Sequence, residues 1–237
     1  MAVGDTTSSK SGSTYTYSAT ILRYDGSRWT SMPTTMTTDL LAIWGSAASD
    51  IYAVGPATVA HYDGAQWTAL TTPSRASFND IHGLAATDVF AAGSLCVYSG
   101  PPNPWDPFSP QQADCTGLVW RYDGSSWKET KLTSAGVTTV DRIWGDSPTE
   151  IYALGQYCAP LEARSIRPIL GEQRACVSRI LRFDGTSGAP VAIDLRDASS
   201  DVFTCPALAG IFAASTGDVF VVGAGETIIQ RCPGGGC

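Results

Sequence analysis

Residues 43–70 read IWGSAASDIYAVGPATVAHYDGAQWTAL, and the first half of this phrase recurs three times along the chain. Each copy keeps an acidic residue directly before an apolar, alternating run that is typical of a half-buried strand. We expect these acidic side chains to be turn residues that accept hydrogen bonds from backbone amides, rather than parts of four active sites. They are Asp50, Asp88, Glu150 and Asp218.

The second half of the phrase carries an Asp-Gly pair and also recurs. Asp-Gly between two apolar runs is a strong hairpin signal, because glycine tolerates positive φ and aspartate caps the turn. The copies are ILRYDGSRW from Ile21, VAHYDGAQW from Val59, LVWRYDGSSW from Leu118 and ILRFDGTSG from Ile180, the last without its tryptophan.

Four short antiparallel strands about every 40 residues are the sequence signature of propeller blades. We therefore predict an all-β fold, a β-propeller with about five four-stranded blades in a single domain, residues 1–237. The expected blades cover residues 1–35, 36–72, 73–132, 133–198 and 199–237. The aligned hairpin aromatics are expected to form the core between neighbouring sheets: Tyr24, Tyr62, Tyr122, Phe183, Trp29, Trp67 and Trp127.

The phrase resembles the repeats of secreted bacterial propellers of the myxobacterial type, W-G-S-x-x-x-D-[IV]-[WY]-A-V-G followed by R-Y-D-G-x-x-W. The resemblance spans nearly the entire chain. The Asp-Gly-x-x-Trp corner is also similar to the Asp-box of sialidase-type propellers, although the spacing differs. Both resemblances imply a propeller scaffold and leave the activity open, because one fold hosts many functions.

The two ends of the chain are expected to be incomplete as blades. Residues 1–4, MAVG, match the second strand of a blade, and PGGGC, residues 233–237, replaces the closing strand of the last one. Three interpretations stay open: a fragment of a larger propeller, strand complementation between chains, and a distorted five-blade ring. Unpaired strand edges are templates for strand addition, so homo-oligomerisation is expected through the termini.

Seven cysteines are a high count for a cytosolic protein and indicate an oxidising compartment. Two pairs bracket insertions at the same point of successive blades, where adjacent antiparallel strands allow disulfide geometry. We expect each of these disulfides to stabilise the fold by about 2–4 kcal/mol. The predicted pairs are Cys96–Cys115 and Cys158–Cys176, with Cys205–Cys232 as a third.

A metal site or a cofactor is not expected. No Cys-x-x-Cys pair occurs, and the only histidines are His61 and His82. Cys237 is the odd cysteine, and its interpretation stays open between a free thiol, a pair between chains and a partner beyond the present end.

The two bracketed insertions, SGPPNPWDPFSPQQAD and APLEARSIRPILGEQRA, interrupt equivalent hairpins, so we expect both on one face of the scaffold, where binding usually resides. Their aromatic and charged residues suit recognition of a sugar or a peptide. The expected ligand-binding residues are Trp105, Asp106, Arg164 and Arg167. The alternative is that Trp105 only anchors its own loop. In the first blade, the Ser/Thr-rich run DTTSSKSGSTYTYSA suggests a flexible loop.

Catalysis in the channel would need a pair of suitably separated carboxylates. Alignment of the inner strands puts Asp80 and Arg142 near the channel, with Asp141 adjacent. Asp80 and Asp141 are the pair of carboxylates to test. His82 stands where the other repeats have aromatic residues, so we expect a packed, hydrogen-bonded histidine rather than a general base. Nucleophile-elbow, zinc-protease and phosphate-loop motifs are absent from the sequence.

Charge and hydropathy exclude two classes of partner. Only 16% of the residues are charged and the net charge is -7, so a nucleic-acid partner is not expected. No apolar run approaches the roughly 20 residues that span a bilayer, so no membrane span is expected. The start, MAVGDTTSSKSG, lacks a secretion signal, which in an exported protein would have been removed or would lie upstream.

These features together predict a non-catalytic, secreted or cell-surface propeller that recognises a glycan or a protein through its stapled loops. Two alternatives stay open. One is a carbohydrate-active hydrolase with its site in the channel. The other is a self-assembling surface or filament subunit joined through open blade edges.

Overall fold

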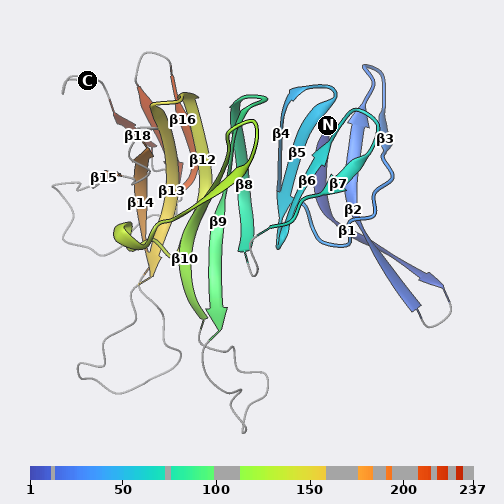
Figure 1. The fold of residues 1–237 in the computed structure, drawn as a ribbon, viewed down its shortest axis with the longest axis horizontal. Coiled ribbons are helices and arrows are strands. Elements are labelled where there is room, and N and C mark those ends of the chain that lie inside the picture. Colours follow the sequence, from blue (N-terminus) through green and yellow to red (C-terminus); the bar gives the residue numbers. More distant parts are fainter. Residues whose placement is uncertain are drawn as a thin grey trace, which may run out of the picture.

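The computed structural model describes residues 1–11, 14–72, 76–98, 113–158, 176–183, 191–193, 208–214, 218–223 and 228–231. The strands form five antiparallel sheets, each made of strands that are consecutive in the sequence. In Figure 1 the sheets stand side by side along the molecule, with β1–β3 at one end and β16–β18 at the other. This succession of small antiparallel sheets confirms the predicted β-propeller fold.

Three of the sheets have four strands. The first of them is β4 (Ala42–Ala47), β5 (Asp50–Gly55), β6 (Thr58–Tyr62) and β7 (Trp67–Ala69). The next is β8 (Ala76–Ala85), β9 (Asp88–Tyr98), β10 (Ala113–Tyr122) and β11 (Trp127–Lys131), followed by a 3-10 turn, η1 (Thr133–Ala135). The third is β12 (Thr139–Ser147), β13 (Glu150–Cys158), β14 (Cys176–Phe183) and β15 (Val191–Ile193).

The two end sheets have three strands each in the part of the chain that the structure describes. They are β1 (Ala2–Ser11), β2 (Thr14–Tyr24) and β3 (Trp29–Ser31), and β16 (Leu208–Ala213), β17 (Val219–Gly223) and β18 (Ile228–Arg231). Strands β4, β8, β12 and β16 contact one another from sheet to sheet, so they are the inner strands of the arrangement.

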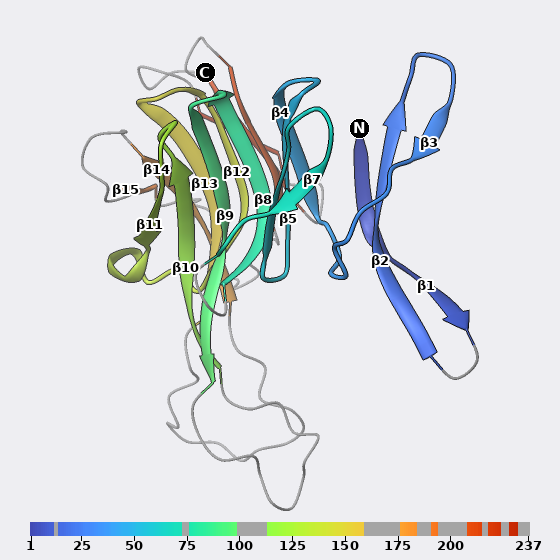
Figure 2. The ribbon, with the colours of Figure 1, turned by 45° about the vertical axis from the view of Figure 1, so that its right-hand side comes forward.

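The Ser/Thr-rich run of the first sheet is not the loop that its composition suggested. Strand β1 continues to Ser11 and β2 starts at Thr14, and the two strands pair along this stretch, with Thr7 opposite Ser18. Figure 2 shows the resulting long hairpin at the end of the molecule. Threonine and tyrosine favour strands, and here they outweigh the low hydrophobicity of the run.

Three hairpins close with the same turn. In the second sheet, Oδ1 of Asp63 accepts the backbone N–H of Ala65 and that of Gln66, each at 2.8 Å. The hydroxyl of Tyr62 donates to the carbonyl of Gly64 at 2.8 Å, and this glycine has a φ of 95°. The Tyr24-Asp25-Gly26 and Tyr122-Asp123-Gly124 turns repeat these contacts.

The acidic residue at the start of each second strand was expected to bind backbone amides, and this expectation is wrong for three of the four residues. Each of the three contacts a basic side chain on the third strand of its own sheet. Opposite charges on adjacent strands stabilise the pairing, which applies to the two arginine contacts, and the histidine contact is a side-chain hydrogen bond between the same two strands. The contacts are Asp50–His61 at 2.7 Å, Asp88–Arg121 at 2.8 Å and Glu150–Arg182 at 3.0 Å.

Apolar clusters fill the spaces between successive sheets. Between the second and third sheets, Tyr52 packs with Phe78 and Trp120, and the last two rings are stacked with centroids 5.7 Å apart. The hairpin aromatics contribute to this core as expected, except in the first sheet. There Tyr24 and Trp29 are about half exposed.

Candidate functional site: an axial pocket

A pocket of about 630 Å³ lies where the inner strands begin. In three of the sheets the lining consists of the two residues that precede the isoleucine of the repeated phrase, and a fourth sheet contributes a similar pair, so four sheets share one cavity. The lining pairs are Leu41-Ala42, Asn79-Asp80, Asp141-Arg142 and Leu208-Ala209, joined by Gln156 of β13. In the fourth of these sheets the lining pair is shifted by one residue, because Gly210 takes the place next to the isoleucine.

β-Bulges create this lining. The register with the second strand shifts between Phe78 and Asp80, so Asn79 is the extra residue on its strand. The same shift leaves Asp141 and Ala209 as extra residues on β12 and β16. A bulge redirects a side chain out of the regular alternation, which brings these residues to the pocket rather than into the core between sheets.

Asp80 connects two inner strands. Its Oδ1 accepts the N–H of Ile81 at 2.9 Å, and its Oδ2 accepts the N–H of Ile143 on β12 at 3.0 Å. Burial raises the pKa of Asp80 above its ordinary value, and these two backbone N–H groups oppose the shift. Because both carboxylate oxygens are engaged, Asp80 is better suited to joining sheets than to transferring protons.

Asp141 lies in the same pocket and is held differently. Its Oδ2 accepts the side-chain amide of Gln156 at 2.7 Å. Burial is the largest influence and raises the pKa of Asp141, while Gln156 and the neighbouring Arg142 lower it. Arg142 is exposed and donates to the backbone carbonyl of Asp141 at 2.7 Å. The carboxylate of Asp141 and the guanidinium of Arg142 therefore line the same cavity, and the two residues are adjacent in the sequence.

Asn79 forms a second link between the inner strands. Its amide nitrogen donates to Thr139 Oγ1 at 3.2 Å and to the carbonyl of Val140 at 2.9 Å. Gln156 is fixed through its backbone carbonyl, which accepts the hydroxyl of Thr138 at 2.9 Å. The polar wall of the pocket is therefore positioned before any ligand binds.

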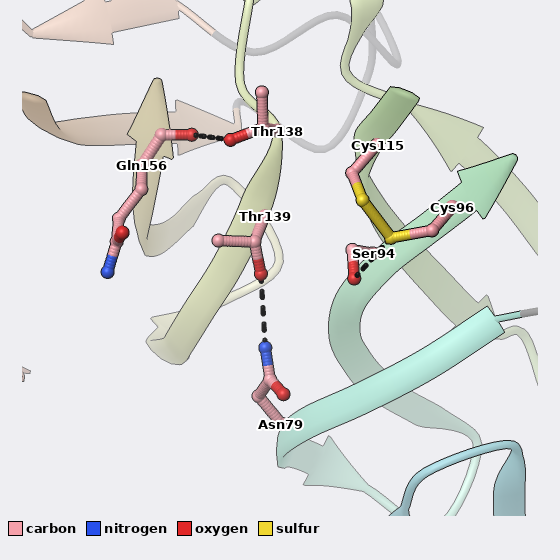
Figure 3. Close-up of a disulfide and its surroundings, with 7 residues drawn as sticks. All are labelled: Asn79, Ser94, Cys96, Cys115, Thr138, Thr139 and Gln156. Carbon is pink, nitrogen blue, oxygen red and sulfur yellow. Dashed lines mark hydrogen bonds between the residues drawn. A yellow bond between two sulfur atoms is a disulfide. The ribbon is translucent and has the colours of Figure 1, made fainter. Parts of the chain in front are cut away.

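A disulfide lies close to this wall. Cys96 of β9 and Cys115 of β10 are bonded, which confirms the prediction for this pair. Figure 3 shows the disulfide in one neighbourhood with Asn79 and Gln156. Most of the segment between these cysteines, one of the two insertions expected to bind ligand, lies outside the described residues.

The second predicted disulfide has the same strand register. Cys158 stands directly opposite Cys176 in the β13–β14 ladder, as Cys96 stands opposite Cys115. The bond itself stays a prediction. Other predicted site residues lie outside the described residues: Trp105, Asp106, Arg164, Arg167, Cys205 and Cys232.

His82 is a packed residue, as predicted. Its ring stacks on Trp144 with centroids 5.4 Å apart, and its Nε2 lies 2.8 Å from the carbonyl of Gly145. Both contacts reach the next sheet. His82 therefore takes the role that aromatic residues play in the equivalent positions.

Asp80, Asp141 and Arg142 were predicted near the channel, whereas Asn79 and Gln156 were not. One signal was available for Asn79, because it occupies the same place before the repeated isoleucine as Asp141. Gln156 follows the glycine that ends the repeated phrase and belongs to no motif, so only its pairing with Thr139 in the β12–β13 ladder places it near the other lining residues.

Comparison with known proteins supports the fold. The structure of YCF48 bound to D1 peptide aligns with a TM-score of 0.52 and 14% identity, over 89% of this chain and 57% of that chain. Two structures of the BT4673 extracellular domain from B. thetaiotaomicron align at 13% identity, with TM-scores of 0.28 and 0.30, over 96% of this chain. This chain thus spans 57% of the first protein and 40% of the second.

Comparisons at the level of sequence are negative. No protein-family model matches the chain, and a search of curated proteins finds no match either. Within the described residues, no helix has the length and apolar character needed to cross a membrane. The similarity to YCF48 shows a common β-propeller fold.

Proposed function

We propose that this chain is a non-catalytic binding propeller that recognises a peptide segment of a protein partner at the axial pocket. The observation that carries the proposal is the preformed polar wall, in which Asp141 and Arg142 stand in a cavity of about 630 Å³. A preformed concave site with a few convergent polar groups is the usual form of a ligand site. The opposite charges of this pair suit the mixed donors and acceptors of a peptide.

The lining favours a peptide over a sugar. None of the described lining residues is aromatic, so the described wall offers no ring on which a sugar would stack. Leu41 and Leu208 instead provide apolar surface on either side of the polar groups. YCF48, which has the same fold, is bound to a peptide in its structure, and this agrees with the proposal.

The stapled insertions complete the proposed site. Trp105 and Asp106 belong to the segment that the Cys96–Cys115 disulfide closes, and Arg164 and Arg167 belong to the equivalent segment of the next sheet. We propose that these residues extend the recognition surface beyond the pocket. The disulfide is also consistent with a secreted or cell-surface location, because such bonds persist in oxidising compartments.

The experiment uses peptide and glycan arrays probed with the full chain, followed by calorimetry on any hit. A peptide hit should lose about tenfold or more in affinity with Asp141→Asn or Arg142→Gln, because a bound partner loses a charge-assisted hydrogen bond. Trp105→Ala tests the extended surface in the same titration. Thr68→Ala is the matched control, because Thr68 is exposed on β7 and absent from the pocket lining.

Two results would contradict the proposal. If peptide affinity is unchanged by both pocket variants, the pocket is not the site. If only glycans bind, the proposed partner class is wrong. Turnover of a glycoside substrate that disappears in Asp141→Asn would instead favour the hydrolase alternative.

A further inference from the structure

The polar wall of the axial pocket lies between two neighbouring sheets. Asn79 and Asp80 belong to β8, Asp141 to β12 and Gln156 to β13. Each of these two sheets packs against another sheet on either side, through the apolar clusters that fill the spaces between sheets. The composition of the wall therefore depends on sheets that are covered on both faces.

The two amide side chains of the wall have an orientation that their neighbours dictate. Nδ2 of Asn79 lies 2.9 Å from the carbonyl of Val140, and a carbonyl can only accept a hydrogen bond. Nε2 of Gln156 lies 2.7 Å from a carboxylate oxygen of Asp141, and an ionised carboxylate likewise only accepts. Each amide must therefore present its nitrogen to its protein neighbour, as Figure 3 shows for Asn79 and Thr139.

This orientation leaves acceptor oxygens unused within the described wall. Among the described residues, Oδ1 of Asn79 and Oε1 of Gln156 accept no hydrogen bond. The carboxylate of Asp141 accepts from Gln156 and from the side chain of Thr139, whereas an ionised carboxylate can accept about four hydrogen bonds. The amide donors of the wall thus serve contacts inside the protein, and several of its acceptors do not.

The charge of the wall favours the same kind of ligand as its unused acceptors. Burial is the largest influence on Asp80 and Asp141, and it raises the pKa of each because it disfavours the charged form. Arg142 lowers both pKa values, but its hydrogen bond goes to a backbone carbonyl and not to a carboxylate. A cationic ligand in contact with Asp141 would therefore favour the ionised carboxylate and donate to the oxygens beside it.

Apolar residues line the same cavity next to these acceptors. They are Leu41 and Ala42, at the start of the second sheet, and Leu208, at the start of the fifth. Leu41 is half exposed, whereas Leu208 is buried. A basic side chain packs its aliphatic stem on apolar surface and places its charged end among polar groups. The two kinds of lining residue match these two parts of such a side chain.

We propose that the axial pocket binds a lysine or arginine side chain of the peptide partner, with its cationic end at the oxygens of Asn79, Asp141 and Gln156 and its stem on the apolar lining. This inference rests on the proposed function and adds the chemical class of the residue that enters the pocket. Arg142 is exposed at the same pocket, so its guanidinium can donate to a carbonyl or a carboxylate elsewhere on the peptide.

The test uses fluorescent, capped heptapeptide libraries that differ only at the central residue, with all other positions randomised. The central residue is lysine, arginine, methionine or glutamate, and fluorescence anisotropy measures binding to the full chain. The lysine and arginine libraries should bind at least about tenfold more tightly than the methionine library, because methionine keeps an apolar stem and lacks the charge-assisted hydrogen bonds. The glutamate library should bind most weakly.

Asp141→Asn is the deciding variant, because asparagine keeps an acceptor for Gln156 and removes the charge that the cation meets. It should reduce the preference for lysine over methionine to about twofold or less. Asp146→Asn is the matched control, since Asp146 is exposed on the same strand and does not line the pocket, so the same change in net charge should leave the preference intact. Arg142→Gln should weaken both libraries and leave the preference undiminished. Circular dichroism establishes that each variant is folded.

The outcomes separate this inference from the proposed function. If the lysine, methionine and glutamate libraries bind equally, or if the preference for lysine survives in Asp141→Asn, the chain binds peptides and the assignment of a basic side chain to the pocket is overturned. If none of the libraries binds, the proposed function fails together with the inference. A preference that is lost in Asp141→Asn and kept in Asp146→Asn is the expected result.

Discussion

The carboxylate of Asp80 on β8 accepts the backbone N–H of Ile143 on β12 at 3.0 Å, so a single side chain bridges two neighbouring inner strands. The same carboxylate accepts the N–H of Ile81 through its other oxygen. An asparagine can supply only one acceptor atom in this position and would turn an amide donor toward the other N–H. The bridge therefore depends on a carboxylate and not on a polar side chain in general.

Asp80→Asn should reduce the free energy of unfolding by about 1–3 kcal/mol, because a buried N–H group loses its acceptor. Urea denaturation followed by circular dichroism measures the change. Asp141→Asn is the control within the same pocket, since asparagine keeps an acceptor oxygen for Gln156. Equal stability of the two variants would rule out a structural role specific to Asp80.

The hairpin aspartates predict a loss of stability in acid. Backbone N–H groups of Arg28 and Ser27 lower the pKa of Asp25 from its ordinary 3.8 to about 2. A group with a lowered pKa stabilises the folded chain above its unfolded pKa, and the contribution is lost as pH falls through the folded pKa. The melting temperature should therefore fall between about pH 4 and about pH 2.

Asparagine at this turn gives the control. Asp25 uses Oδ1 alone for both backbone N–H groups, so Asp25→Asn preserves the acceptor and removes the titration. The combined variant with Asp63→Asn and Asp123→Asn should show a flatter dependence of melting temperature on pH than the unmodified chain. A dependence of undiminished slope would assign the acid sensitivity to other carboxylates.

The ion pair between Asp88 and Arg121 should contribute to pairing of β9 with β10. A double-mutant cycle with Asp88→Asn and Arg121→Met should give a coupling energy of about 0.5–1 kcal/mol, because the pair is partly buried and makes two hydrogen bonds. The more exposed Lys131–Glu129 pair, with N–O at 3.1 Å, is the comparison. Its coupling energy should be close to zero, and a larger value there than for Asp88–Arg121 would refute the assignment.

The cysteine register predicts two disulfides in the oxidised chain. Peptide mapping without reductant should recover Cys96 linked to Cys115 and Cys158 linked to Cys176. Replacement of Cys96 and Cys115 by serine should cost about 2–4 kcal/mol of stability, chiefly through the unfolded chain. Detection of Cys158 as a free thiol in fully oxidised protein would count against the second bond.

Local signals predicted most of the fold. The Asp-Gly turn and the alternating runs act within about ten residues, so they identify hairpins without knowledge of the rest of the molecule. Because the phrase recurs, a hairpin identified in one copy also predicts a hairpin in each of the other copies. The disulfide between Cys96 and Cys115 could also be predicted, because the positions of both cysteines relative to the repeated phrase place them on adjacent strands.

Features that depend on how the strands pair could not be predicted from the local sequence. Asp88 and Arg121 are 33 residues apart in sequence, and only the alignment of β9 with β10 reveals them as a pair. Exposure of Tyr24 and Trp29 depends on the absence of a covering sheet among the described residues, and the local sequence is the same as in buried copies. Composition also led to a wrong prediction. The Ser/Thr-rich run of the first sheet has the composition of a flexible loop, but it forms two paired strands of a hairpin.

The bulges on three inner strands each place one extra residue at the pocket: Asn79, Asp141 and Ala209. Asn79 and Asp141 also hydrogen-bond to other strands of the propeller, so their exchange would change the scaffold together with the pocket. Ala209 is exposed and has no hydrogen-bonding side chain. Randomisation of Ala209 would therefore vary the ligand preference of the pocket while the contacts of Asn79 and Asp141 stay in place.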